Sequence, residues 1–179
     1  MSFDDLLLDA VLDPSRTDFT ALREAWLERD GPERAVWDEE AFEELHMRLA
    51  TKDWDGALDL ADELLETHPL AVELRLWRAQ ALAGSGDRRE ANIERAIANG
   101  LLKAVLSSGD GESADSPLVV LCAREERLVL NLMGLRAVRS ALGELGGRWI
   151  DEVLTSDIEG HERVLFFHLR VPERWINPR

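Results

Sequence analysis

The sequence has a single cysteine and no long apolar segment. Cys122 has no second cysteine with which to form an intramolecular disulfide, so the chain is compatible with a reducing compartment. It has no run of about 18 apolar residues, which a membrane-spanning helix would need. Asp4 and Asp5 stand near the start, where a secretory signal carries basic residues. We therefore expect neither a membrane span nor an export signal, and we expect a cytoplasmic protein.

Positive charge is also scarce. The chain of 179 residues has 21 Lys/Arg and 36 Asp/Glu, a net charge of −15. Residues 1–106 contain 12 basic and 24 acidic residues, whereas residues 107–179 contain 9 and 12. A negative field of this kind repels phosphate backbones, so we expect no nucleic-acid binding, and it would steer a basic protein or peptide toward the chain. The alternative is that the charge only keeps the protein soluble.

The sequence lacks the common signatures of metal, nucleotide and nucleophile sites. The histidines form no His-x-x-x-His pair and are not spaced with Cys122 as a zinc set would be. No Gly-x-Ser-x-Gly elbow is present. Cys122 belongs to an apolar run that fits a buried strand, so we expect its thiol to be buried and inert. The stretch SSGDGESADSP lacks the lysine of a phosphate loop and the glutamate of a Ca²⁺ loop. We therefore predict no metal ligands, no cofactor and no catalytic residue.

A 34-residue register is the strongest internal pattern. In this register Asp53 matches Asp87, Ala57 matches Ala91, and Leu45 matches Ala79. The stretch DWDGALDLADELLETHP reads as a helix that ends at a proline, which has no amide hydrogen to continue it. The period, the small residues and the proline resemble the tetratricopeptide repeat. This resemblance implies two helical hairpins, at about 38–71 and 72–105.

Two hairpins are fewer than the three or so that usually bury a continuous core, so we expect non-repeating segments to cap them. Residues 1–37 are predicted to form a helical cap. Its first helix would contain an apolar group ended by Asp13-Pro14, and Thr17 or Asp18 would cap a second helix with Leu22 and Trp26. The apolar group consists of Leu6, Leu7, Leu8, Val11 and Leu12.

The rest of the chain changes in character after residue 106. Residues 107–117 are rich in Gly, Ser and Asp and predict a linker loop. In residues 118–179 we predict a short buried strand, a helix over 124–133 opened by Glu125 and Glu126, and three strands. The strands are expected over residues 136–145, 148–156 and 163–171. The predicted fold class is α+β, with two tetratricopeptide-like hairpins (38–106) packed as one unit against a small, mainly antiparallel sheet with one helix.

The whole layout resembles a family of uncharacterised bacterial proteins. The resemblance rests on DPSRTDFTALREAW, the repeat pair, GLLKAVLSSGDGESADSPLVVL, the Glu-Glu helix and the final aromatic strand ERVLFFHLRVP. Phe166-Phe167 stands where that family is expected to have a Tyr-Phe pair. The family has no assigned activity, so the resemblance implies a fold and transfers no catalytic residue.

The repeat resemblance also implies a concave groove, lined by the first helix of each hairpin. Positions on one face of these helices would carry acidic and apolar side chains. They are Glu39, Phe42 and His46 in the first hairpin and Glu73, Leu76 and Gln80 in the second. Such a groove favours a basic segment with an apolar anchor. Alternatively, the chain's own N-terminal helices or sheet fill the groove.

Two classes of function follow from these observations. The first is a non-enzymatic interaction module, an adaptor or scaffold, whose acidic helical surface binds a protein or peptide; an immunity-type inhibitor of a basic partner belongs to the same class. The second is an enzyme with a site between helices and sheet, for which Glu125, Glu126 and His168 are the polar candidates. This second hypothesis requires the three side chains to converge. The sequence leaves the partner's identity and the oligomeric state open.

Overall fold

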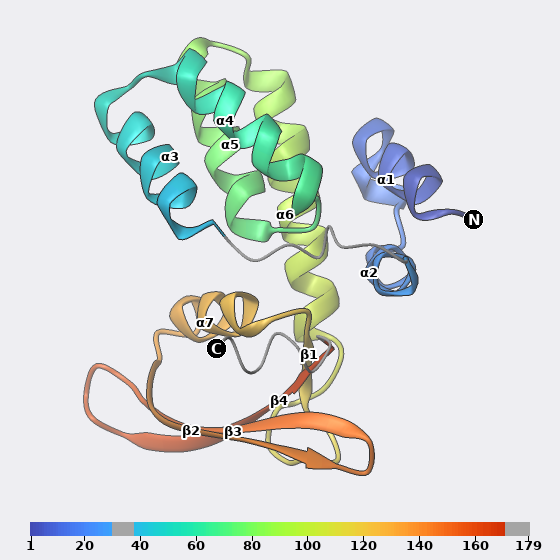
Figure 1. Cartoon of the computed structure of the whole chain (residues 1–179), viewed down its shortest axis with the longest axis vertical. Coiled ribbons are helices and arrows are strands. Elements are labelled where there is room, and N and C mark those ends of the chain that lie inside the picture. The colour runs from blue at the N-terminus through green and yellow to red at the C-terminus, as the bar shows by residue number, and fades with distance from the viewer. Residues whose placement is uncertain (30–37, 171–179) are drawn as a thin grey trace. The chain divides into compact units, whose positions relative to one another are not determined.

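The computed structural model describes residues 1–29 and 38–170 (Figure 1). The chain divides into two compact units, Met1–Leu101 and Leu102–Arg179, and each is described by itself. The fold class is α+β, as predicted. The predicted end of the cap at residue 37 and the end of the last predicted strand, Val171, lie outside the described residues.

The first unit begins with two short helices, α1 (Phe3–Leu12) and α2 (Phe19–Glu28), joined by a 3₁₀ turn. Asp18 caps α2, because its carboxylate accepts hydrogen bonds from the backbone N–H groups of residues 20 and 21. Only part of the apolar group of α1 is buried. Leu6 is buried, together with Phe3 and Ala10 at helical spacing, whereas Leu8, Val11 and Leu12 are exposed on the opposite side.

Four longer helices follow, and the last of them continues past Leu101, the end of this unit (Figure 1). They are α3 (Glu39–Thr51), α4 (Trp54–Thr67), α5 (Val72–Ser85) and α6 (Arg88–Leu106). The turns α3–α4 and α5–α6 are built alike and lie 34 residues apart. Lys52 and Gly86 end the first helix of each pair in the left-handed conformation. Asp53 and Asp87 follow, and each accepts a hydrogen bond from the backbone N–H three residues later.

The helices of the first unit pack through alanines and leucines. Ala57 and Ala91, the central matches of the 34-residue register, are both fully buried, as are Leu45 and Ala79. Small side chains at these positions let neighbouring helices approach closely, while Phe42, Leu64 and other large residues fill the space around them. All three pairs of register positions therefore have similar environments.

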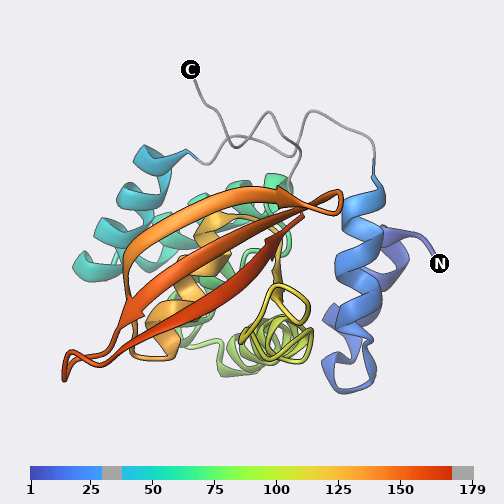
Figure 2. The same ribbon diagram turned by 90° about the horizontal axis from the view of Figure 1, so that it is seen from below.

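The second unit is a four-stranded sheet with one helix, α7, on one face (Figures 1 and 2). The elements are β1 (Leu118–Val120), α7 (Ala123–Leu132), β2 (Arg136–Leu145), β3 (Arg148–Ser156) and β4 (Glu162–Leu169). The strand order is β1-β4-β3-β2. Strands β2, β3 and β4 pair antiparallel, and β1 adds to β4 in parallel. The three long strands lie within a few residues of their predicted positions, and the sheet is mixed.

Side chains alternate across this sheet, and one face forms the core. On β4, Leu165, Phe167 and Leu169 are buried in a cluster that also contains Val129 and Leu130 of α7. The two-residue turn between β2 and β3 is Gly146-Gly147, and both glycines have positive φ, which a tight hairpin of this kind requires. None of the described helices is long and apolar enough to cross a membrane.

Cys122 lies outside the buried strand in which its apolar run predicted it. The buried strand ends at Val120, and Cys122 lies two residues later, where it occupies the N-cap position of α7 and is half-buried. The apolar run LVVLC is therefore divided between a strand and a helix start. The chain turns here because Glu125 folds back and accepts a hydrogen bond from the backbone N–H of Leu121, at 2.6 Å.

Candidate functional site

The predicted groove residues of α3 have different environments. Glu39 and His46 are exposed, and the His46 ring lies 6.0 Å from the ring of Trp77 on α5. Phe42 is instead a core residue. Its side chain is 2% exposed and makes an edge-to-face contact with Trp77, with 5.8 Å between the ring centroids. It is buried because it points to the same side of α3 as Leu45 and Leu49, toward α4 and α5.

The predicted groove residues of α5 share one stripe. Leu76 and Gln80 are exposed and Glu73 is half-buried. Their spacing of three and four residues places them on one side of the helix. The opposite side carries Leu74 and Leu82, which are buried. The outward-facing set on α3 and α5 therefore comprises Glu39, His46, Glu73, Leu76 and Gln80, and we call it the α3–α5 surface.

Acidic side chains dominate the exterior of helices α3, α4 and α5. Residues 38–87 contain 13 Asp/Glu and four Lys/Arg. All of these acidic residues except Glu73 are exposed. On α4 they form a stripe of Asp55, Asp59, Asp62 and Glu66, at spacings of three and four residues.

Most of the basic residues in this segment are already paired. Arg48 pairs with Glu44 on the same helix. Arg75 is buried and pairs with Glu94 of α6, which also pairs with Arg78. Arg78 reaches Asp62 of α4 as well, at 2.6 Å. These cations neutralise carboxylates of the same unit, and 13 acids against four bases leave residues 38–87 with a net negative charge.

Glu125, Glu126 and His168, the candidates for an enzyme, do not converge. Glu125 and Glu126 lie in the first turn of α7 and are buried. His168 pairs in register with Ile150 and alternates with the buried Phe167 and Leu169, so it lies on the sheet face opposite α7. The sheet separates the histidine from the two glutamates.

The structure brings Glu126 together with a residue that sequence reasoning missed, Asp151 of β3. Asp151 is buried on the sheet face that α7 covers, in register with Phe167. Ser140 of β2 lies 2.9 Å from both carboxylate oxygens of Asp151, to which its hydroxyl donates. Burial, and to a smaller extent the negative charge of Asp151, raise the pKa of Glu126 to about 8 against the opposing effect of Arg127. The sequence offered one indication of this pair, because Asp151 in the strand WIDEV alternates with its neighbours onto the same sheet face as Trp149 and Val153.

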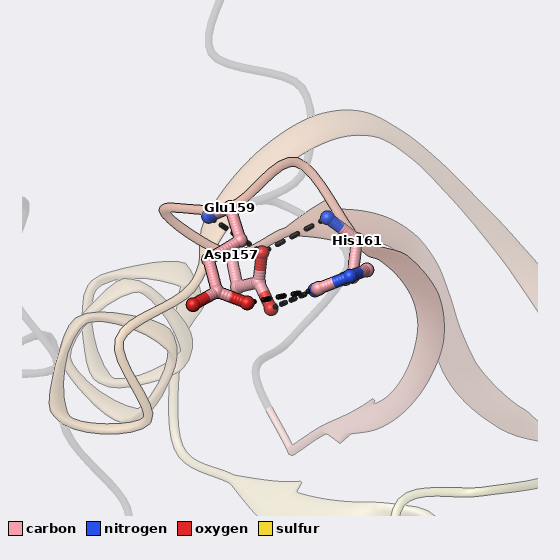
Figure 3. Close-up of side chains that lie close together, drawn as sticks. All are labelled: Asp157, Glu159 and His161. Carbon is pink, nitrogen blue, oxygen red and sulfur yellow. Dashed lines mark hydrogen bonds and ion pairs between the residues drawn. The ribbon is translucent and has the colours of Figure 1, made fainter.

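A second cluster lies at the turn between β3 and β4 (Figure 3). Asp157, Glu159 and His161 each offer one ligand atom, and these atoms lie within 4.8 Å of one another. The set could hold one small divalent cation. Sequence reasoning missed it, although the acid-x-acid-x-histidine pattern was visible.

Hydrogen bonds within this turn account for its geometry. Asp157 Oδ1 accepts the backbone N–H groups of Glu159 and His161, both at 2.9 Å, and Oδ2 lies 3.0 Å from Nδ1 of His161. The backbone N–H of His161 is the main cause that holds the pKa of Asp157 below its usual value. Beside the turn is a surface pocket of about 580 Å³, to which Asn131 and Arg136 contribute.

Comparison with known families assigns the chain. A family model described as a domain of unknown function, DUF4919, matches residues 27–144, more than half of the chain. The chain belongs to the DUF4919 family. The DUF4919 match includes α3 to α7 and most of β2, and therefore the α3–α5 surface and Glu126, whereas Asp151 and the β3–β4 turn lie beyond it. No curated protein and no solved structure matches this chain.

Proposed function

We propose that the helical unit of this DUF4919 chain is a non-enzymatic interaction module that binds a basic protein segment on the α3–α5 surface. The observation that carries the proposal is the charge arrangement. Three of the four basic residues in 38–87 pair with acids of the same unit, whereas twelve of the 13 acids are exposed. A net negative charge of this extent attracts a cationic partner and speeds its association.

The α3–α5 surface suits such a partner better than the acidic stripe of α4. It combines Glu39 and Glu73 with Leu76, whose side chain is 37% exposed, and with the exposed His46. Binding surfaces that give useful affinity combine an apolar anchor site with polar groups around it. The stripe of α4 offers carboxylates alone, so we expect it to steer a partner and the α3–α5 surface to hold it.

The proposed architecture of this module is a pair of tetratricopeptide-like hairpins over residues 38–106. The support is the 34-residue register of buried alanines, together with the left-handed residues Lys52 and Gly86 and their following Asp caps. In such repeats the first helix of each hairpin faces the ligand. The α3–α5 surface lies on these first helices, α3 and α5.

The test is peptide binding with two matched charge reversals. Fluorescein-labelled peptides that combine Lys/Arg with a Leu or Phe anchor would be titrated with the full chain, and fluorescence anisotropy would be read at low and high salt. Glu39→Lys with Glu73→Lys should weaken binding at least tenfold. Asp59→Lys with Glu66→Lys on α4 changes the net charge equally and should weaken binding only a few-fold.

Three results would count against the proposal. If both double variants reduce the affinity equally, the interaction is a diffuse field effect with no specific surface. If binding does not change with salt, charge is not the basis of recognition. If no basic peptide binds the wild-type chain at low salt, the partner class is wrong.

A further inference from the structure

Glu126 is the unusual residue of the second unit. It lies in the first turn of α7 on the side that packs against the sheet, and its side chain is 6% exposed. Its Oε2 atom is fully buried and has no hydrogen-bond partner in the described part of the chain. A buried ionised carboxylate without partners is strongly disfavoured, because no water or donor replaces its hydration.

The adjacent carboxylates avoid this problem. Glu125 Oε2 accepts the backbone N–H of Leu121 at 2.6 Å, and Asp151 accepts from the Ser140 hydroxyl at 2.9 Å. Each of these two carboxylates therefore has a hydrogen-bond donor while α7 is docked on the sheet. The Oε2 atom of Glu126 has no comparable donor among residues 1–29 and 38–170.

Among the residues that the structure describes, the groups that face Glu126 from the other elements do not supply a positive charge. Asp151 faces it from β3 and adds a like charge. β1 contributes apolar side chains to this interface, as does β4 with Leu165, Phe167 and Leu169, and β2 contributes the Ser140 hydroxyl, with Glu144 further along the same face. On α7 itself, Arg127 is exposed and opposes the effect only partly.

We propose that docking of α7 on the sheet is linked to a proton on Glu126, so that the helix packs firmly when this carboxyl is neutral and loosens when it ionises. When α7 opens, Glu126 regains water and its usual acidity. In the docked state the proton is retained up to a pH of about 8. Between these limits one proton is released on opening, and the opening equilibrium rises about tenfold for each pH unit.

The direction of the linkage follows from the raised pKa. Docking is strongest below the usual pKa of a glutamate, where Glu126 is neutral in both states. It weakens as the pH rises toward 8, and above 8 it weakens no further because the carboxyl is then ionised in both states. The docking of α7 on the sheet is thus strongest at acidic pH and weaker at alkaline pH.

Hydrogen exchange of the full chain, followed by mass spectrometry from pH 5 to pH 9, tests this linkage. After correction for intrinsic exchange, protection of the peptides from residues 123–132 should fall by about tenfold per pH unit between pH 5.5 and 7.5. Glu126→Gln should remove this slope and keep the protection seen at pH 5. Glu125→Gln is the matched control, since it makes the same chemical change one residue away, and it should keep the slope.

Two further measurements keep the proposal testable if Glu126→Gln does not fold. Asp151→Asn removes the like charge, so Glu126 ionises at a lower pH in the docked state. The fall in protection should therefore stop at a lower pH than in the wild-type chain, and the total loss of protection should be smaller. In the wild-type chain, ¹³C NMR of the glutamate carboxyls should show one group that titrates near pH 8. Titration of Glu126 near its usual value, a flat wild-type profile, or a slope seen only with added Ca²⁺ or Mg²⁺ would overturn the proposal.

Discussion

Arg75 and Glu94 form a buried ion pair between α5 and α6. The Arg75 Nη1 atom lies 3.1 Å from Glu94 Oε2, and the two side chains are 7% and 6% exposed. Arg75 also donates from Nε and Nη2 to the carbonyl oxygen of Pro69. One guanidinium therefore holds the end of the α4–α5 connection and the middle of α6 together. Pro69, which follows the C-cap of α4, is thus held by a residue of α5.

Removing Arg75 should be costly, because Glu94 would keep only Arg78 of its two described cations and the carbonyl oxygen of Pro69 would lose both guanidinium donors. We expect Arg75→Ala to lower the free energy of unfolding by about 2–4 kcal/mol. Urea unfolding followed by circular dichroism measures the change. Arg88→Ala at the exposed start of α6 is the control and should cost less than about 0.5 kcal/mol. Equal effects of the two substitutions would show that the Arg75 pair contributes no more than a surface charge.

Lys52 and Gly86 offer a reciprocal test at equivalent turns. Both are left-handed, with φ of 61° and 104°, but a lysine in this conformation suffers a steric cost that glycine avoids. Lys52→Gly should therefore raise the free energy of unfolding by about 0.5–1 kcal/mol, and Gly86→Lys should lower it by about 1 kcal/mol or more. Thermal unfolding at constant pH measures both. Changes of the same sign in the two variants would contradict the structural equivalence of the turns.

Short-range chemistry explains why so much of the fold was predictable. Asp18, Asp53 and Asp87 each mark a helix start, because their carboxylates accept backbone N–H groups that the helix leaves unpaired. Gly146-Gly147 marks the β2–β3 turn, because its conformation excludes most other residues. Caps and turns depend on neighbours in the sequence, so the pattern alone indicates the elements and the α+β class.

The candidate site was less predictable, since it depends on which elements meet. Phe42 occupies a groove position of the repeat pattern, yet the packing of α4 and α5 buries it against Trp77. Glu126 reads as a favourable acid in a first helical turn, but the sheet covers that side of α7 and brings Asp151 near it. His168 has the right chemistry for a site and lies on the opposite sheet face. No local pattern specifies these long-range pairings.

The β3–β4 turn should depend on Asp157. Its carboxylate accepts two backbone N–H groups and faces Nδ1 of His161. Asp157→Ala removes all three interactions and should increase hydrogen exchange in residues 157–162, whereas Asp157→Asn keeps an acceptor oxygen and should have a smaller effect. Because the pKa of Asp157 is lowered, its contribution is present above the usual aspartate pKa and is lost only as the pH falls through the lower folded value. Protection of the turn that does not change in Asp157→Ala would contradict this role.

Ala57 and Ala91 provide a direct test of the repeat. Both are fully buried at matching positions of α4 and α6, where a larger side chain has no space. Ala57→Leu and Ala91→Leu should each destabilise the chain by about 1–3 kcal/mol through overpacking. Ala96→Leu, on the exposed side of α6, is the control for helix propensity and should change stability by less than about 0.5 kcal/mol. The decisive comparison is between the two buried sites. If only one of the two substitutions destabilises the chain, the two hairpins are not packed as equivalent repeats. The α3–α5 surface then loses its structural basis as a ligand-facing side.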